Sequence, residues 1–145
     1  MNEPLFFQVE GIPVPDWVVD QAFCEIDKDV VINEDLIKWA DETILPLTQQ
    51  HLQLQDLVIC ANHVHIGPGG LTPHDHLPHV FTSVLYLLDA EGPLVIHDQQ
   101  GNHHRVHPKE GRLVIFSARL LHHVERSPHD ELRISFVSNY EFPSV

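Results

Sequence analysis

The chain of 145 residues is 43% hydrophobic and has a formal net charge of −13, a composition that fits one globular domain with one core. The negative charge repels phosphate backbones and anionic membrane surfaces, which argues against binding to nucleic acid or to membranes. No apolar run approaches the roughly 20 residues that span a bilayer, and the first residues lack a basic segment followed by a long apolar stretch. We therefore expect a cytoplasmic protein.

The first third of the chain is predicted to contain edge strands, turns and one helix. Prolines separate short apolar pieces in residues 1–32, which favours edge strands and turns rather than a helix. A helix is predicted over residues 34–51, bent near Pro46, because apolar residues recur there at helical spacing. Asn33 precedes this segment and is a residue type that caps helix N-termini.

From residue 57 onward the pattern changes to short β-rich segments bounded by Gly, Pro, Asp or Asn. The predicted strands cover residues 57–66, 71–76, 81–88, 94–97, 105–107, 111–117, 122–126 and 132–140. Several short strands after one helix predict a mainly β sandwich or jelly roll with an N-terminal helical brace. We expect one domain over 1–145, with an arm and helix in 1–56 and core strands in 57–140.

The two cysteines, Cys24 and Cys60, lie far apart in the sequence and lack CxxC spacing. This arrangement argues against a disulfide framework and against a zinc ribbon. We expect both thiols to be buried.

A pair of histidines on one predicted strand indicates half of a metal site. Successive strand residues point to opposite faces, so His74 and His76 can direct both imidazoles into one cavity while Asp75 points away. A third nitrogen from a distant strand would complete one face of a coordination sphere and leave the opposite face open for small ligands. His122 is the best-placed donor for that position.

The chain has 13 histidines, so chance proximity must be weighed for each of them. His63 and His65 form a rival pair on the preceding strand, ranked lower because no distal histidine and arginine accompany it. His123 is expected on the opposite face of its strand from His122, in a surface or packing role. The histidines between residues 97 and 107 are expected around an exposed hairpin loop.

An ordered series of short motifs over about residues 58–140 resembles a known family. The motifs are Asn62, Gly69, residues 74–76, 82–87, 92–94, 108–116, 122–124 and 133–136. In this combination they are similar to the core strands of 2-oxoglutarate and Fe(II)-dependent oxygenases, most closely the prolyl-hydroxylase-like branch and its small bacterial and phage members. The resemblance implies a double-stranded β-helix, a cupin-like form of the jelly roll.

The resemblance implies a metal site and also a departure from the family pattern. His74 matches the first Fe(II) ligand, His122 matches the distal ligand, and His76 stands where the family has a carboxylate. Three neutral imidazoles give the site one negative charge less than the family's two histidines and a carboxylate. This difference is expected to change which metal is preferred and to weaken retention of the metal. Zinc or nickel are therefore alternative metals in the purified protein, and contact of His76 with substrate or 2-oxoglutarate is an alternative to metal binding.

The resemblance also implies a site for the cosubstrate, 2-oxoglutarate. Arg133 matches the basic residue that binds its distal carboxylate, and Tyr86 and Ser135 match groups that help to hold it. A guanidinium inside a barrel is costly unless an anion meets it, and its planar fork matches a carboxylate. The alternative is an ion pair of Arg133 with Glu125 or Glu131 at the barrel rim.

The implied function is a metal-dependent dioxygenase that couples decarboxylation of 2-oxoglutarate to hydroxylation of a C–H bond in an unknown substrate. Asn62 and His79 are candidates for the substrate side. Two other classes stay open: a cupin-type three-histidine dioxygenase that uses no 2-oxoglutarate, and a non-catalytic metal-binding or sensor module of the same fold.

Overall fold

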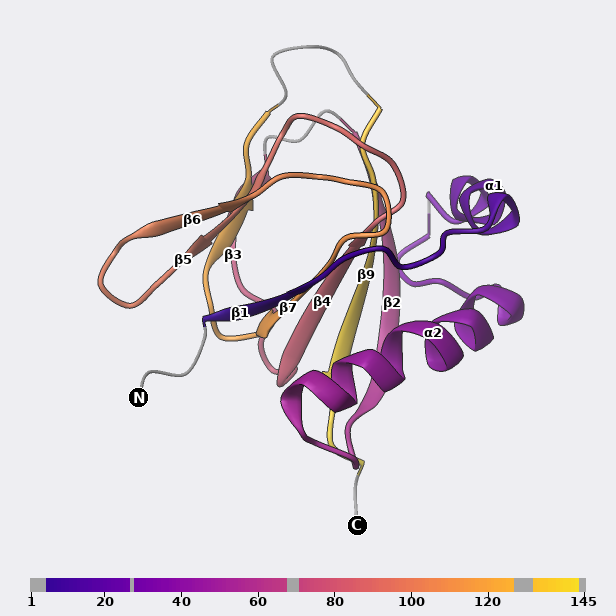
Figure 1. Cartoon of the computed structure of the whole chain (residues 1–145), viewed down its shortest axis with the longest axis horizontal. Coiled ribbons are helices and arrows are strands. Elements are labelled where there is room, and N and C mark those ends of the chain that lie inside the picture. The colour runs from indigo at the N-terminus through magenta and orange to yellow at the C-terminus, as the bar shows by residue number, and fades with distance from the viewer. Residues whose placement is uncertain (1–4, 27, 68–70, 127–131, 144–145) are drawn as a thin grey trace.

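The computed structural model describes residues 5–26, 28–67, 71–126 and 132–143, and its strands form two sheets (Figure 1). In chain order, the elements of these residues are β1 (Phe6–Val9), α1 (Asp16–Cys24), α2 (Glu34–Leu52), β2 (Val58–Ile66), β3 (Leu71–His74), β4 (Phe81–Tyr86), β5 (Leu94–His97), β6 (His103–Val106), β7 (Leu113–Ser117), β8 (His122–Val124) and β9 (Ile134–Glu141). The larger sheet has the order β1-β7-β4-β9-β2 and the smaller one β3-β8-β5-β6, with every described strand pair antiparallel. The predicted mainly β jelly roll is confirmed.

Alternating side chains of the larger sheet contribute to two separate cores. In β4, Val84 and Tyr86 belong to the core between the sheets, where Leu94 of β5 is also buried. The neighbouring Leu85 and Leu87 belong to a second core, which the larger sheet shares with the helices. This division follows from the two-residue period of a strand, which sends successive side chains to opposite faces.

The predicted helix forms as α2 and packs beside the larger sheet. Its N-cap is Asn33, whose side chain accepts a hydrogen bond from the Leu36 N–H at 3.0 Å. Trp39 is buried and meets Phe136 of β9 edge to face, with 5.6 Å between the ring centroids. Figure 1 shows both helices on the side of the molecule where β2 and β9 lie.

The prediction that residues 1–32 contain strands and turns but no helix is wrong in part. The edge strand exists as β1, which pairs with β7 alone, but residues Asp16–Cys24 form α1. Pro15 occupies the N-cap, so this proline marks the start of the helix and does not interrupt it. Val18 and Ala22, four residues apart on one helix face, are fully buried against the second core.

Both cysteines are exposed, contrary to the prediction. Cys24 is the last residue of α1. Cys60 lies on β2, which is an edge strand, at a point where the register with β9 shifts. An edge position and a local irregularity of this kind leave a small side chain in contact with solvent.

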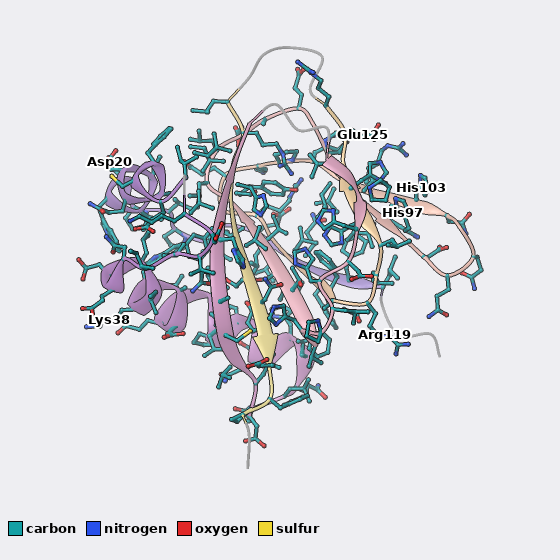
Figure 2. All side chains as sticks on the ribbon, turned by 180° about the vertical axis from the view of Figure 1, so that it is seen from behind. Asp20, Lys38, His97, His103, Arg119 and Glu125 are labelled. Atoms are coloured by element: carbon teal, nitrogen blue, oxygen red, sulfur yellow. The ribbon has the colours of Figure 1, made fainter. Side chains whose placement is uncertain are left out.

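The β5–β6 hairpin projects from the molecule on the side away from the helices (Figures 1 and 2). Its histidines flank the hairpin turn as predicted, and His97 and His103 are paired residues of the two strands, with their rings stacked at 4.2 Å. His123 of β8 lies beside them, 2.6 Å from His97 between ring nitrogens.

Within the described ranges, no helix is long and apolar enough to cross a membrane.

Candidate metal centre

Three histidines from two neighbouring strands and a loop converge between the sheets. His74 of β3 and His122 of β8 are direct register partners, with their ring centroids 4.3 Å apart. Their ligand nitrogens and one from His76 all lie within 4.8 Å of one another. The Nε2 atoms of His76 and His122 are 2.9 Å apart. Two nitrogens bound at right angles, each about 2.1 Å from one metal, would be separated by about 3.0 Å. The three side chains are therefore arranged as one face of a coordination sphere.

His76 reaches this position from a loop, which corrects the prediction that His74 and His76 share a strand. β3 ends at His74, and the His76 backbone N–H donates to the carbonyl of Ala118 at 2.9 Å. Asp75 is exposed, and its carboxylate accepts a hydrogen bond from the Leu77 N–H at 3.1 Å. The loop backbone therefore directs the imidazole inward.

Two of the three histidines, His76 and His122, are held in the neutral form that binds metal. His122 Nδ1 lies 3.0 Å from the carbonyl oxygen of Leu120, an acceptor only, so Nδ1 carries the proton and Nε2 keeps its lone pair. Burial, opposed in part by this hydrogen bond, lowers the pKa of His122 to about 3. Burial and the nearby His74 lower the pKa of His76 to about 4. Both imidazoles are consequently neutral near pH 7, as metal coordination requires.

Arg133 supplies a buried positive charge in the same space. Its side chain is 5% exposed, and its Nε has no hydrogen-bond partner. Nη2 lies 3.4 Å from the Tyr86 hydroxyl, and the guanidinium carbon lies 5.3 Å from the centre of that ring. Neither contact neutralises the charge, so the guanidinium can accept an anion.

The predicted alternative of an ion pair with Glu125 is wrong, because Glu125 binds Arg105 at 2.5 Å on the exterior (Figure 2). Glu131, the other rim carboxylate considered, lies outside the described residues, as does Gly69 of the sequence motifs. Among the residues that the structure describes, no carboxylate forms a salt bridge with Arg133.

One cavity joins the three histidines to Arg133. Its lining residues are His65, His74, His76, Val84, Leu94, His122, Val124, Arg133, Ser135 and Val137. Polar groups therefore occupy two parts of the wall, and aliphatic side chains from both sheets separate them. The free volume is about 30 Å³, room for only one or two water-sized groups.

His65 is a site residue that the sequence reasoning ranked low. It lies opposite Ser135 in the β2–β9 register and lines the cavity. Burial, together with His63, Arg133 and His74, lowers its pKa. The pairing of His65 with His63 was visible in the sequence, but the His63 ring instead contacts the carbonyl of Asp29.

The two candidates for the substrate side do not line this cavity. The Asn62 side chain is buried and accepts a hydrogen bond from the Ser138 hydroxyl at 2.6 Å. His79 follows β3 and lies with its Nδ1 3.2 Å from the Cys60 sulfur.

Comparisons with known proteins give a family match over part of the chain. A 2OG-Fe(II) oxygenase family model matches residues 90–139, a segment that contains His122 and Arg133 but not His74 or His76. No curated protein matches the chain in sequence.

Solved structures share the fold across nearly the whole chain. A prolyl-4-hydroxylase from Pseudomonas putida is 18% identical, with a TM-score of 0.68 over 97% of this chain and 94% of that one. The non-heme alpha ketoglutarate dependent epimerase SnoN from nogalamycin biosynthesis is 15% identical, with a TM-score of 0.75 over 95% and 78%. A structure of SnoN with Fe3+, alpha ketoglutarate and nogalamycin RO is 14% identical, with a TM-score of 0.73 over 95% and 79%.

The family match confirms the resemblance to the 2-oxoglutarate and Fe(II)-dependent oxygenase superfamily, and the solved structures confirm the double-stranded β-helix fold. Fe(II) and 2-oxoglutarate, the cofactors expected from the sequence, are those of the matched family of enzymes.

Proposed function

We propose that this protein is an Fe(II)- and 2-oxoglutarate-dependent oxygenase that hydroxylates a C–H bond of a substrate still to be identified. One observation carries the proposal: a buried guanidinium without a carboxylate partner among the described residues faces the same cavity as three convergent imidazoles. A metal-binding module without a diacid ligand would bury the charge of Arg133 without a bound anion.

The metal would be held by His74, His76 and His122. The donor set fits a divalent transition metal, because all three ligands are imidazoles and two of them are neutral at physiological pH. The Leu120 carbonyl holds His122 in the correct tautomer. When bound, Fe(II) with 2-oxoglutarate supplies the oxygen activation that no side chain can provide.

Arg133 would hold the distal carboxylate of 2-oxoglutarate. Its unpaired Nε can donate to one carboxylate oxygen while a terminal nitrogen donates to the other, the bidentate geometry that guanidinium groups favour. Tyr86 is positioned by its contact with Arg133, and the hydroxyl of Ser135 lies on the cavity wall. These three residues would orient the cosubstrate toward the histidines.

The apolar wall completes the proposed site. Val84, Val124 and Val137 lie on three different strands around the cavity and are almost fully buried. They exclude water from the space between the metal ligands and Arg133, which strengthens the electrostatic interactions there.

A three-histidine dioxygenase that uses no 2-oxoglutarate is the second candidate. The presence of His76, where the matched family is expected to have a carboxylate, favours it. This function would leave the charge of Arg133 buried without an anion, at an energetic cost.

Succinate formation separates the two candidates. Protein supplied with Fe(II), ascorbate and 2-oxoglutarate is expected to form succinate slowly even without a prime substrate, and Arg133→Met is expected to lose this turnover. Binding of 2-oxoglutarate is measured in parallel by calorimetry with a redox-inert divalent metal. Retained metal without measurable 2-oxoglutarate binding would instead support the second candidate.

A further inference from the structure

A second group of metal-ligating side chains lies outside the cavity between the sheets. The Cys60 sulfur, a ring nitrogen of His79 and a carboxylate oxygen of Glu141 all lie within 4.8 Å of one another. Cys60 and Glu141 are exposed, His79 is half-buried, and none of them lines the first cavity. The group is therefore a separate feature, open to ions from solvent.

Three chain segments bring these residues together at one end of the larger sheet. β2 begins where β9 ends, with Val58 opposite Glu141. The register shifts once across Cys60, between Ile59 and Ala61, which indicates a β-bulge that turns a side chain out of the regular pattern. The Val80 N–H donates to the carbonyl of Tyr140 at 2.9 Å and so brings the residue before it, His79, alongside β9.

The chemistry of the group selects a borderline divalent cation. A thiolate, an imidazole and a carboxylate are the three ligand types that Zn²⁺ takes in proteins, and its tetrahedral site would leave one position for water. The Cys60 sulfur and His79 Nδ1 are already 3.2 Å apart, close to the separation of about 3.5 Å expected for two such ligands on one tetrahedral zinc. We propose that Cys60, His79 and Glu141 form a second metal site, which binds Zn²⁺.

The Cys60 sulfur lies close to a carboxylate and to a backbone carbonyl, so a metal that binds there has to displace the thiol proton. Burial and the adjacent Glu141 carboxylate raise the pKa of the Cys60 thiol. The thiol proton then has an acceptor in the carbonyl of Asn139, 3.2 Å away. A divalent cation between the sulfur and the carboxylate replaces that proton, and both groups then become its ligands.

The second site is connected to the first through a short loop. The His79 N–H donates to the carbonyl of His76 at 3.0 Å, and His76 is one of the three histidines of the metal centre. Zn²⁺ bound to His79 therefore restrains the loop that presents His76.

Cobalt substitution tests the proposal without dependence on activity. A Co²⁺–thiolate bond absorbs in the near ultraviolet, and the three-histidine centre has no sulfur, so the signal reports on cysteine alone. The 145-residue protein is treated with a chelator and then titrated with Co²⁺ and afterwards with Zn²⁺. We expect a saturable thiolate band that Zn²⁺ abolishes, since Zn²⁺ binds such ligands more tightly than Co²⁺.

Four variants assign the band. Cys24→Ser is the matched control, because Cys24 is the other thiol of the chain and is also exposed; it is expected to keep the band. Cys60→Ser is expected to lose it, and His79→Ala and Glu141→Gln are each expected to weaken Co²⁺ binding at least tenfold. Absence of the band in the wild type overturns the proposal. So does a band that survives Cys60→Ser, or one that neither His79→Ala nor Glu141→Gln weakens. The wild type, His79→Ala and Glu141→Gln suffice for the test if Cys60→Ser fails to fold.

Discussion

Replacing Arg133 with methionine removes the buried charge while keeping a side chain of similar length. Arg133 is 5% exposed and its Nε lacks a hydrogen-bond partner. The free protein therefore carries the cost of an incompletely satisfied charge, and only a bound anion can recover that cost. The substitution should affect ligand binding strongly and the stability of the free protein weakly.

The magnitudes follow from the contacts. A hydrogen bond between charged groups contributes about 1.5 to 3 kcal/mol, and each 1.4 kcal/mol is about tenfold in Kd. Loss of Arg133 is therefore expected to raise the Kd of 2-oxoglutarate roughly 10- to 100-fold. In the free protein, removal of the unsatisfied group should raise the free energy of unfolding by about 1 to 3 kcal/mol. Loss of the contact with the Tyr86 ring costs about 0.5 to 2 kcal/mol. The free energy of unfolding should then change by no more than about 2.5 kcal/mol.

Two measurements on the same sample test this reasoning. Calorimetric titration gives the Kd of 2-oxoglutarate with a redox-inert metal present, and urea unfolding without ligand gives the free energy of unfolding. Arg105→Met is the matched control, because Arg105 is half-exposed and pairs with Glu125; its effect on Kd should be less than about twofold. An unchanged Kd in Arg133→Met, combined with a loss of more than about 3 kcal/mol in stability, would refute the anion-binding role and indicate a structural ion pair.

Further predictions concern the metal ligands and the buried polar network. His122→Ala should abolish stoichiometric Fe(II) by metal analysis, whereas His123→Ala, on the opposite side of the strand, should retain it. His76→Asp should slow the loss of Fe(II) to a chelator, because it restores a negative ligand. Tyr140→Phe removes two buried hydroxyl contacts, including one to Thr48 at 2.9 Å, and should lower the free energy of unfolding by about 1 to 3 kcal/mol. Burial raises the pKa of Tyr140 to about 12, above the value of about 10 for an exposed phenol. The unfolded chain then ionises first, so wild-type stability should fall as the pH rises from about 10 to 12, and urea unfolding of the phenylalanine variant should lack this component.

The parts of the fold and site that could be predicted from the sequence depend on short-range periodicity. The strand predicted at residues 94–97 coincides with β5, and the helix predicted over 34–51 forms with its Asn33 cap. His74 and His122 each end or begin a short strand, and antiparallel pairing places them opposite each other. For the helix and for each single strand, a pattern of a few neighbours is sufficient, whereas the pairing of His74 with His122 joins distant segments.

The parts that failed depend on contacts between distant segments. α1 is stabilised because Val18 and Ala22 are buried against other elements. The prolines near it in the sequence argued against a helix, and the burial cannot be read from the local pattern. His76 faces the centre because its backbone binds Ala118, a residue far along the chain. His65 joins the cavity because β2 lies next to β9 in the register that sets His65 opposite Ser135. No local pattern encodes these pairings.

The histidine at position 76 and the buried arginine have a common electrostatic consequence. Three imidazole ligands would leave the charge of a bound divalent metal uncompensated, and Arg133 adds a positive charge with no carboxylate partner among the described residues. With a metal bound, the cavity would be a positive region inside a chain of net charge −13. A dianionic cosubstrate would then supply the negative charge that a carboxylate ligand at position 76 would otherwise provide. Metal and 2-oxoglutarate should then bind cooperatively, because each lowers the electrostatic cost of the other.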